Sequence, residues 1–298
     1  MRVLVTGGAG FLGSNVVDAL VARGDLVVAI DDLSTGERTN LAPDIPFRHV
    51  SVADARALER AVHGEGFDAI VHCAAKTKVV ESMAKPELYR RVIVDGTRNV
   101  VALAESVHAQ ILVNLSTGGA MYGETPTCAT EHTPAEPDSN YGKFKLEAER
   151  IVAASDVPSI TLRCANIYGP RQRQDLEGGV IAIFLGCWRR KEPITIYGDG
   201  TAERDYVYVG DVADAVQSAF AGTWRGLFNV GTGVATSVNQ LVAQFTELLG
   251  PPAGVVRAPA RAVETQRSCV DPHKAAHDGF WMPKTALREG LARTIELA

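Results

Sequence analysis

Short apolar runs alternate with longer amphipathic segments through the first half of the chain. Runs rich in Val, Ile and Leu predict strands, and apolar residues that recur every three or four positions predict helices. The expected strands are Arg2–Thr6, Leu26–Ile30, Phe47–Val50, Ala69–His72 and Gln110–Leu115, and the expected helices are Phe11–Ala22, Ala55–Val62, Glu87–Ser106 and Tyr141–Ala154. Strands that alternate with helices predict βαβ units and a parallel sheet that is covered on both faces.

The pattern becomes less regular after about Pro158. We expect strands at Ser159–Arg163, Ile194–Tyr197 and Tyr206–Val209, and helices at Gly178–Arg190, Val212–Phe220, Ser237–Leu249 and Lys284–Glu296. The fold class is therefore predicted as α/β, with a Rossmann-type doubly wound parallel sheet in residues 1–165 that also receives segments from about 206–232. A smaller mixed part is expected in 166–298, with a cleft between the two parts.

Composition and charge narrow the class of protein. The chain has 298 residues, 46% of them hydrophobic and 22% charged, and a net charge of −5, which excludes a disordered chain and disfavours nucleic acid and anionic membranes as partners. The most apolar stretch, Gly178–Trp188, is shorter than the roughly 20 residues of a membrane span. The apolar run at the N-terminus is too short for a secretory signal, so a cytoplasmic location is expected.

The cysteines are odd in number and lack metal-site spacing. They are Cys73, Cys128, Cys164, Cys187 and Cys269, with no C-x-x-C pair among them. We therefore expect small buried hydrophobic residues rather than a disulfide framework or a zinc site.

A glycine-rich turn follows the first expected strand and opens the first helix. Its sequence, from Thr6 to Gly13, is TGGAGFLG. Glycines allow a tight turn and a close approach of the backbone to a pyrophosphate, and the helix N-terminus favours negative charge. Asp31 and Asp32 close the second strand, where a carboxylate binds the adenosine ribose and repels a 2′-phosphate. NAD is thus favoured over NADP, although Arg38 nearby keeps NADP open.

Tyr141 and Lys145 are one helical turn apart and share a face of the expected helix. A phenol titrates near pH 10 and becomes a useful base at neutral pH when positive charge stabilises its anion. Lys145 and an oxidised nicotinamide ring are expected to provide that charge. Upstream, Ser116 and Thr117 place hydroxyls at the end of a strand.

In this order the motifs resemble those of the extended short-chain dehydrogenases/reductases, most closely the bacterial nucleotide-sugar epimerases of the UDP-glucose 4-epimerase family. Matching stretches are Thr6–Gly13, His72–Ala75, Gly96–Thr97, Ser116–Gly123, Tyr141–Lys145, Asn166–Arg171, Tyr197–Gly200, Arg204–Tyr208 and Asn229–Gly233. The resemblance implies NAD-dependent 4-epimerisation of a UDP-glucose or UDP-galactose type of substrate through a transient 4-keto intermediate.

The resemblance also implies roles for individual residues. Tyr141 removes the proton of the sugar 4-hydroxyl, Lys145 lowers the phenol pKa and binds the nicotinamide ribose, and Thr117, or alternatively Ser116, hydrogen-bonds the reacting oxygen. The residues expected to contact NAD are Gly7, Gly10, Phe11, Leu12, Gly13, Asp31, Asp32, Ser51, Val52, Ala74, Ala75, Thr77, Tyr141 and Lys145.

Substrate contacts are implied in the second half. Asn166 is expected at the diphosphate sugar, Arg204 and Arg261 at the phosphates, Glu264 at the nucleoside ribose, Tyr197 near the base, and Ser268, a small residue, beside the sugar 2-substituent. A UDP-hexose is the expected substrate, and the resemblance implies a homodimer formed through the two long helices.

Two departures from the family pattern leave other functions open. Ser51 stands where relatives often carry an aspartate that contacts adenine, and Ile93 replaces an asparagine that commonly supports the cofactor. A catalytically silent NAD-binding regulator is therefore one alternative. A reductase or a 4,6-dehydratase is another, although dehydratases carry an Asp-Glu pair where this chain has Gly118 and Gly119.

Overall fold

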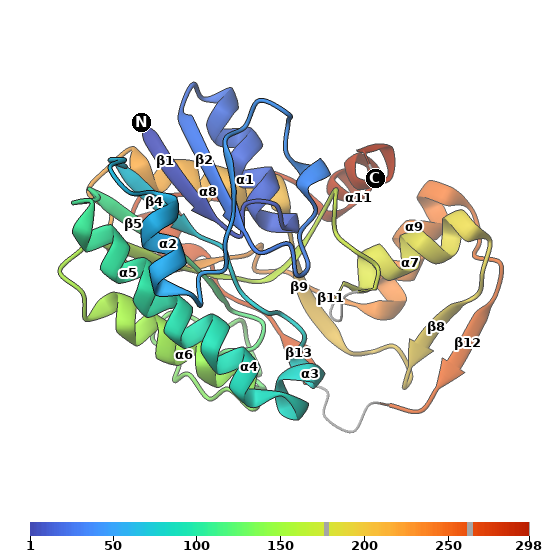
Figure 1. Ribbon diagram of the computed structural model, residues 1–298. Helices are drawn as coiled ribbons and strands as arrows, with labels where there is room; N and C mark the ends of the chain where they lie inside the picture. The colour runs from blue at the N-terminus through green and yellow to red at the C-terminus, as the bar shows by residue number, and fades with distance from the viewer. Residues whose placement is uncertain (176–178, 261–264, 298) are drawn as a thin grey trace.

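The structure of the protein is a computed structural model that describes residues 1–175, 179–260 and 265–297. Its larger part is a seven-stranded parallel sheet in the order β10-β6-β5-β4-β1-β2-β3 (Figure 1). The strands are β1 (Arg2–Thr6), β2 (Leu26–Asp31), β3 (Phe47–His49), β4 (Ala69–His72), β5 (Ile111–Thr117), β6 (Ser159–Cys164) and β10 (Gly226–Val230). The predicted doubly wound sheet is confirmed.

Helices cover both faces of this sheet (Figure 1). One face packs against α1 (Phe11–Ala22) and α8 (Val209–Phe220), and the other against α2 (Ala55–Ala61), α5 (Gly96–Ser106) and α6 (Asn140–Ala153). Strands buried on both sides explain why runs such as Val27–Ile30 are apolar without alternation. Short helices are η1 (Arg38–Asn40), α3 (Val79–Ala84), α4 (Pro86–Arg90) and α10 (His273–His277).

The strand order reverses between β1 and β4, which opens a crevice at the carboxyl ends of these strands. His72, at the end of β4, links three elements there. Its Nδ1 lies 2.7 Å from the Thr6 hydroxyl of β1, and its Nε2 lies 3.1 Å from the Thr97 hydroxyl of α5. Burial lowers the pKa of His72 to about 3, so the ring is neutral and one nitrogen donates while the other accepts.

The single helix predicted at Glu87–Ser106 is wrong in one respect. Between α4 and α5 the backbone forms a π-helical stretch, η2 (Arg91–Asp95). The Thr97 hydroxyl donates a 2.5 Å hydrogen bond to the Ile93 carbonyl and competes with the regular helix for that acceptor. This wider turn includes Ile93, whose side chain is buried between Tyr89 and Ala148 rather than directed into the cleft.

The smaller part is built from short strands and helices (Figure 1), and their side chains form an apolar core of their own. One sheet contains β7 (Asn166–Tyr168), β9 (Glu203–Tyr208), β11 (Ala235–Ser237) and β13 (Arg267–Ser268), and β8 (Ile194–Tyr197) pairs with β12 (Val255–Ala258). The helices are α7 (Val180–Arg190), α9 (Val238–Leu249) and α11 (Leu287–Leu297). Of the predicted 206–232 insertion, β10 joins the large sheet, whereas β9 belongs to the small one.

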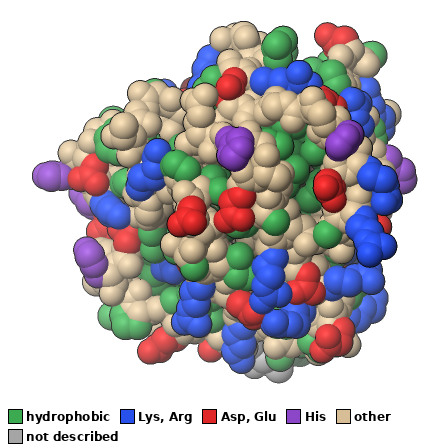
Figure 2. All heavy atoms as spheres, turned by 60° about the vertical axis from the view of Figure 1, so that its left-hand side comes forward, with side chains coloured by type: hydrophobic (Ala, Val, Ile, Leu, Met, Phe, Trp, Pro, Cys, Tyr) green, Lys and Arg blue, Asp and Glu red, His purple; other side chains and the backbone are tan. Residues whose placement is uncertain are grey.

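On the face shown in Figure 2, basic, acidic and hydrophobic side chains are interspersed. Within the described residues, no helix is both long and apolar enough to cross a membrane.

Candidate active site

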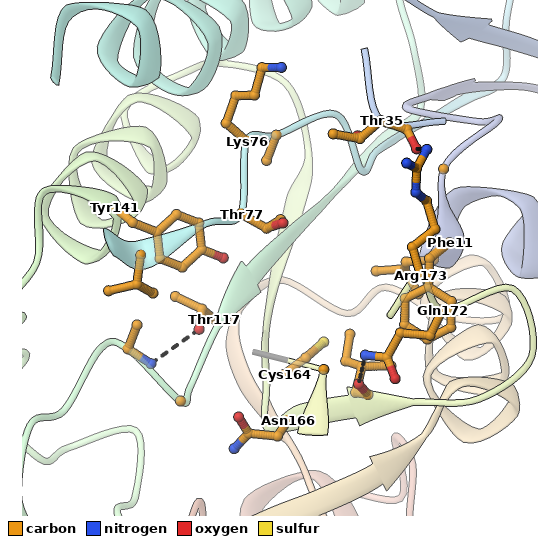
Figure 3. A pocket seen from close by; sticks show the side chains of 18 of the residues that line it. Phe11, Thr35, Lys76, Thr77, Thr117, Tyr141, Cys164, Asn166, Gln172 and Arg173 are labelled. Carbon is orange, nitrogen blue, oxygen red and sulfur yellow. Dashed lines mark hydrogen bonds between the residues drawn. The ribbon is translucent and has the colours of Figure 1, made fainter. Parts of the chain in front are cut away.

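A cavity of about 990 Å³ lies at the carboxyl ends of the large sheet and extends to the smaller part of the protein. Figure 3 shows side chains from both parts directed toward it, with Tyr141 and Thr117 from one and Asn166 and Gln172 from the other. A crevice at the switch point of an open α/β sheet is where such folds bind ligands.

The glycine turn forms one wall of this cavity and fits a pyrophosphate. Gly7 has φ +67°, and a Cβ atom there would lie 2.7 Å from the Ala74 backbone nitrogen. The N-cap of α1 is Gly10, which gives no side-chain capping bond, so the first N–H groups of α1 are available to an anion. Phe11 and Leu12, the first residues of α1, line the cavity.

The two aspartates that follow the turn have different surroundings. Asp31 is buried and accepts hydrogen bonds from the backbone N–H groups of Ala9 (3.1 Å) and Leu33 (2.8 Å). Burial nevertheless raises the pKa of the Asp31 carboxyl. Each of its oxygens keeps a lone pair, so the carboxylate can still accept ribose hydroxyls.

Asp32 is hydrogen-bonded to Ser51, the residue that stands where relatives often carry an aspartate. Its carboxylate accepts hydrogen bonds from the Ser34 N–H (2.9 Å) and from the Ser51 hydroxyl (3.2 Å). Burial opposes ionisation of Asp32, but these hydrogen bonds and the charge of Lys76 hold its pKa below the ordinary value. Ser51 is absent from the cavity lining, whereas its neighbour Val52 lines it.

The Arg38 side chain is hydrogen-bonded to the backbone of the following loop and does not face the cofactor site. Its guanidinium donates to the backbone carbonyls of Leu41, Ala42, Pro43 and Ile45 at 3.0 to 3.4 Å. It also lies over the Phe47 ring, 5.5 Å from the centroid. An arginine used in this way is not poised to hold a 2′-phosphate, which strengthens the case for NAD.

Tyr141 and Lys145 lie on the cavity side of α6, which begins after the capping residue Ser139. The Lys145 ammonium donates a 2.8 Å hydrogen bond to the Leu115 carbonyl, and burial lowers its pKa to about 8. Burial raises the pKa of Tyr141 to about 12, although a hydrogen bond with Thr117 acts in the other direction. Burial therefore dominates the phenol pKa of the protein alone, and the lowering by Lys145 and the nicotinamide ring that the resemblance implies stays a prediction.

The two candidate hydroxyls on β5 have different partners. The Ser116 hydroxyl donates to Glu149 at 2.5 Å, and Glu149 in turn forms a buried ion pair with Arg163 at 2.6 Å. Thr117 lies near the Tyr141 phenol, whose pKa its hydroxyl lowers, and accepts a 3.2 Å hydrogen bond from the Ala120 N–H (Figure 3). The structure therefore places Thr117, rather than Ser116, beside the phenol.

Asn166, Tyr197 and Arg204, three of the residues expected to contact the substrate, line the cavity from the smaller part of the protein, and their contacts stay predictions. The Ser268 side chain is buried and donates to the Gly119 carbonyl at 3.2 Å, and it is absent from the lining. Arg261 and Glu264 lie outside the described residues. Their predicted contacts therefore stay predictions.

Residues that the sequence did not single out also shape this side. Asp205 is fully buried and accepts hydrogen bonds from the Thr232 hydroxyl (2.5 Å) and the Thr232 N–H (3.0 Å), joining two family motifs. Arg173 and Lys76 line the cavity from opposite parts (Figure 3). Arg173 follows a matched motif by two residues, so an extension of that motif could have indicated it.

The interpretation of the cysteines is wrong for two of the five. Cys128 and Cys269 form a disulfide, whereas Cys73, Cys164 and Cys187 are free. The pair is separated by 141 residues, so no spacing in the sequence could indicate it. Among the residues that the structure describes, no group of three or more His, Cys, Asp or Glu side chains is arranged to hold a metal ion.

This fold and this site define a dinucleotide-binding enzyme of the extended short-chain dehydrogenase/reductase class. Comparison with known proteins makes the assignment specific: the chain belongs to the NAD dependent epimerase/dehydratase family, whose model matches residues 3–231. The family resemblance expected from the motifs is therefore confirmed.

The matches to individual relatives cover nearly the whole chain. This chain is 36% identical over 307 residues to a UDP-glucose 4-epimerase of Mycolicibacterium smegmatis, and the match covers 99% of this chain and 98% of that protein. The structure of the UDP-glucose 4-epimerase of Thermus thermophilus in complex with NAD has a TM-score of 0.94 and 37% identity, covering 99% of this chain and 98% of that one. UDP-glucuronic acid decarboxylase 1 of Arabidopsis thaliana is 31% identical over 310 residues, 99% of this chain and 69% of that protein.

Proposed function

We propose that this protein is an NAD-dependent nucleotide-sugar 4-epimerase of the UDP-glucose/UDP-galactose type, with Tyr141 as its base. The observation that carries the proposal is the grouping of the Tyr141 phenol, the Thr117 hydroxyl and the Lys145 ammonium along one cavity that the glycine turn also lines. The similar epimerases of Mycolicibacterium and Thermus support the choice of reaction.

The chain's own residues then act as follows. When bound, NAD supplies a hydride acceptor and donor at the sugar C4. Thr117 orients the 4-oxygen through its hydroxyl, and Tyr141 takes the proton of the 4-hydroxyl and later returns it. Lys145, whose pKa is lowered by burial to about 8, is still mostly protonated at neutral pH and binds ribose hydroxyls.

The nucleotide is assigned to the opposite wall. Asn166 and Arg204 are proposed to bind the diphosphate sugar and Tyr197 to lie near the base, since all three line the cavity. We accordingly propose that residues 1–165 bind the cofactor and residues 166–298 bind the substrate.

The geometry around two glycines argues against a 4,6-dehydratase. A Cβ atom at Gly118 would lie 2.5 Å from Val270 Cγ1, and one at Gly119 would lie 3.4 Å from the Asn166 amide nitrogen. An Asp-Glu pair at these positions would clash with Val270 or crowd Asn166. This chain therefore lacks the Asp-Glu pair that dehydratases of the superfamily use for the elimination step.

We also propose a homodimer that forms through α5 and α6 and a cytoplasmic location, both carried over from the sequence interpretation. Sedimentation velocity tests the dimer: a species of twice the mass of the 31.8 kDa chain supports it, and a concentration-independent monomer contradicts it.

An NMR time course tests the reaction. The protein is incubated in D₂O with catalytic NAD⁺ and UDP-galactose, UDP-N-acetylgalactosamine or UDP-galacturonate in separate tubes. Formation of the C4 epimer without deuterium at C4 supports internal return of the hydride and identifies the sugar. If no epimer forms in any of the three tubes, the UDP-sugar assignment is wrong.

A further inference from the structure

Two segments that border the substrate side of the cavity are covalently joined. Cys128, in the loop between β5 and α6, forms a disulfide with Cys269, which follows β13 directly. Beside the disulfide, the Ala129 N–H donates to the Cys269 carbonyl at 2.9 Å, and the Asp271 N–H donates to the Ala129 carbonyl at 2.8 Å. The loop and the β13 segment therefore form one cross-linked unit.

A carboxylate and a hydroxyl extend this unit toward the site. Glu124 accepts hydrogen bonds from the N–H groups of Gln266 (2.7 Å) and Arg267 (2.8 Å). The Ser268 hydroxyl donates to the Gly119 carbonyl at 3.2 Å. The β13 segment is thus held in place by the same loop that follows the catalytic hydroxyl of Thr117.

The cross-linked unit contributes to the proposed nucleotide wall. Gly119 of the loop and Thr265 before β13 line the cavity. In addition, β13 pairs with β9 so that Ser268 lies opposite Arg204, which lines the cavity as well. A shift of the β13 segment would therefore change the wall that receives the nucleotide.

The disulfide is placed for exchange with thiols. The Cys128 residue is half-buried, whereas Cys269 is only 3% exposed, so Cys128 is the more accessible end of the disulfide. The Arg267 guanidinium, which also forms a 2.8 Å ion pair with Glu203, lies 3.9 Å from the Cys128 sulfur, where a positive charge favours a thiolate. Burial raises the pKa of the free thiols of Cys73 and Cys164 to about 12, which keeps both unreactive.

We propose that the Cys128–Cys269 disulfide is a redox-controlled cross-link that sets the affinity of the cavity for the nucleotide of the substrate. This inference rests on the proposed function for the kind of ligand. In the oxidised protein the wall is preformed. In the reduced protein the loop and the β13 segment are held by noncovalent contacts alone, among them the Arg267–Glu203 ion pair and the packing of Ala129 and Val270, so ligand binding must also order them, at a cost in affinity.

A dithiol can reduce the Cys128–Cys269 disulfide in two thiol–disulfide exchange steps. One thiolate of the dithiol attacks the Cys128 sulfur, the S–S bond of the protein breaks, and Cys269 leaves as a thiolate that takes up a proton. The second thiol then displaces Cys128, which also becomes a thiol. Two electrons pass to the protein, and the dithiol becomes a disulfide.

Titration calorimetry tests the proposal. The binding of UDP and of dTDP to the 298-residue chain is measured before and after treatment with dithiothreitol, at a temperature at which both forms are folded. Mass spectrometry counts the thiols: three before reduction, Cys73, Cys164 and Cys187, and all five cysteines afterwards. We expect the Kd of the nucleotide that binds to rise about tenfold on reduction, and the Kd of NAD to stay the same.

Variants separate the cross-link from general effects of the reductant. The double variant Cys128→Ser/Cys269→Ser is expected to bind nucleotide like the reduced protein and to ignore dithiothreitol. Cys187→Ser, which removes a free thiol in α7, is the matched control and keeps the full response.

Three outcomes overturn the inference. Five free thiols before reduction would show that the disulfide does not form. Equal nucleotide affinity in both redox states would show that it does not control binding, while leaving the proposed function intact. Failure of both nucleotides to bind in either state would overturn the inference together with the proposed nucleotide-sugar function.

Discussion

Ser116 and Thr117 are neighbours at the end of β5, yet their hydroxyl groups serve different parts of the protein. Ser116 donates a 2.5 Å hydrogen bond to Glu149 in the interior, whereas Thr117 lines the cavity and its hydroxyl lowers the pKa of the Tyr141 phenol. Successive residues of a strand point to opposite faces of the sheet, which separates the two roles.

Thr117→Val is expected to lower kcat by about a hundredfold with little change in stability, because it removes the hydroxyl but keeps the shape. Ser116→Ala is the matched control. It should keep most of kcat and lose about 1–3 kcal/mol of stability, since buried Glu149 loses a donor. Steady-state kinetics and urea unfolding of both variants check this, and the opposite pattern would mean that Ser116 is the catalytic hydroxyl.

Tyr141→Phe is expected to lower kcat by at least about a hundredfold while NAD still binds. The phenol pKa is about 12 in the protein alone, because burial disfavours the phenolate, and the charge of bound NAD⁺ should lower it. The phenolate fraction, and with it the rate, should therefore rise with pH until the lowered pKa is passed.

Ultraviolet difference titration of the protein with and without NAD⁺, with Tyr141→Phe as the blank, measures this shift. An unchanged phenol pKa on NAD⁺ binding would contradict the role of the cofactor charge.

Asp31→Asn is expected to weaken NAD binding by about tenfold and to reduce discrimination against NADP, because an amide no longer repels a 2′-phosphate. Arg38→Ala should destabilise the protein without changing the NAD to NADP ratio, since Arg38 serves the carbonyls of residues 41–45. Fluorescence titrations with both cofactors test the pair, and a loss of NADP binding in Arg38→Ala would refute this account.

Stability is expected to fall in mild acid because of His72. Its pKa is about 3 in the folded protein and 6.5 in a model peptide, so between these values the unfolded chain takes up a proton that the folded chain does not. The contribution is fully present above pH 6.5 and is lost by about 1.4 kcal/mol per pH unit below it.

Urea unfolding at pH 7 and pH 5.5 measures this loss. His72→Gln should have a smaller loss between the two pH values than the wild type, whereas exposed His49→Gln should behave like the wild type. Equal losses in His72→Gln and the wild type would rule out His72 as the cause.

Much of the fold could be predicted because its signals are local. Buried strands such as Arg2–Thr6 and Ala69–His72 are apolar without interruption, and their alternation with helices restricts the topology. The π-helical stretch at Arg91–Asp95 could not be predicted, because the Thr97 hydroxyl that accompanies it matters only once α5 packs under His72.

Some features of the candidate site could also be predicted from the sequence, and others could not. Residue types and their order indicated the glycine turn, Asp31, and the Tyr141 and Lys145 pair, whose chemistry depends on spacing along a strand or helix. The choice between Thr117 and Ser116 and the use of Arg38 depended on which groups lie within hydrogen-bonding distance.

By itself, then, the sequence determined the doubly wound sheet, the family and the residues available for chemistry, because periodicity and motif spacing are properties of neighbouring residues. Only the tertiary structure decided the partners across the chain: the Cys128–Cys269 disulfide, the commitment of Ser116 to Glu149 and the pKa of about 12 for Tyr141. Proximity between distant residues and desolvation in a closed interior arise when the elements pack together, and neither is written in the spacing of the sequence.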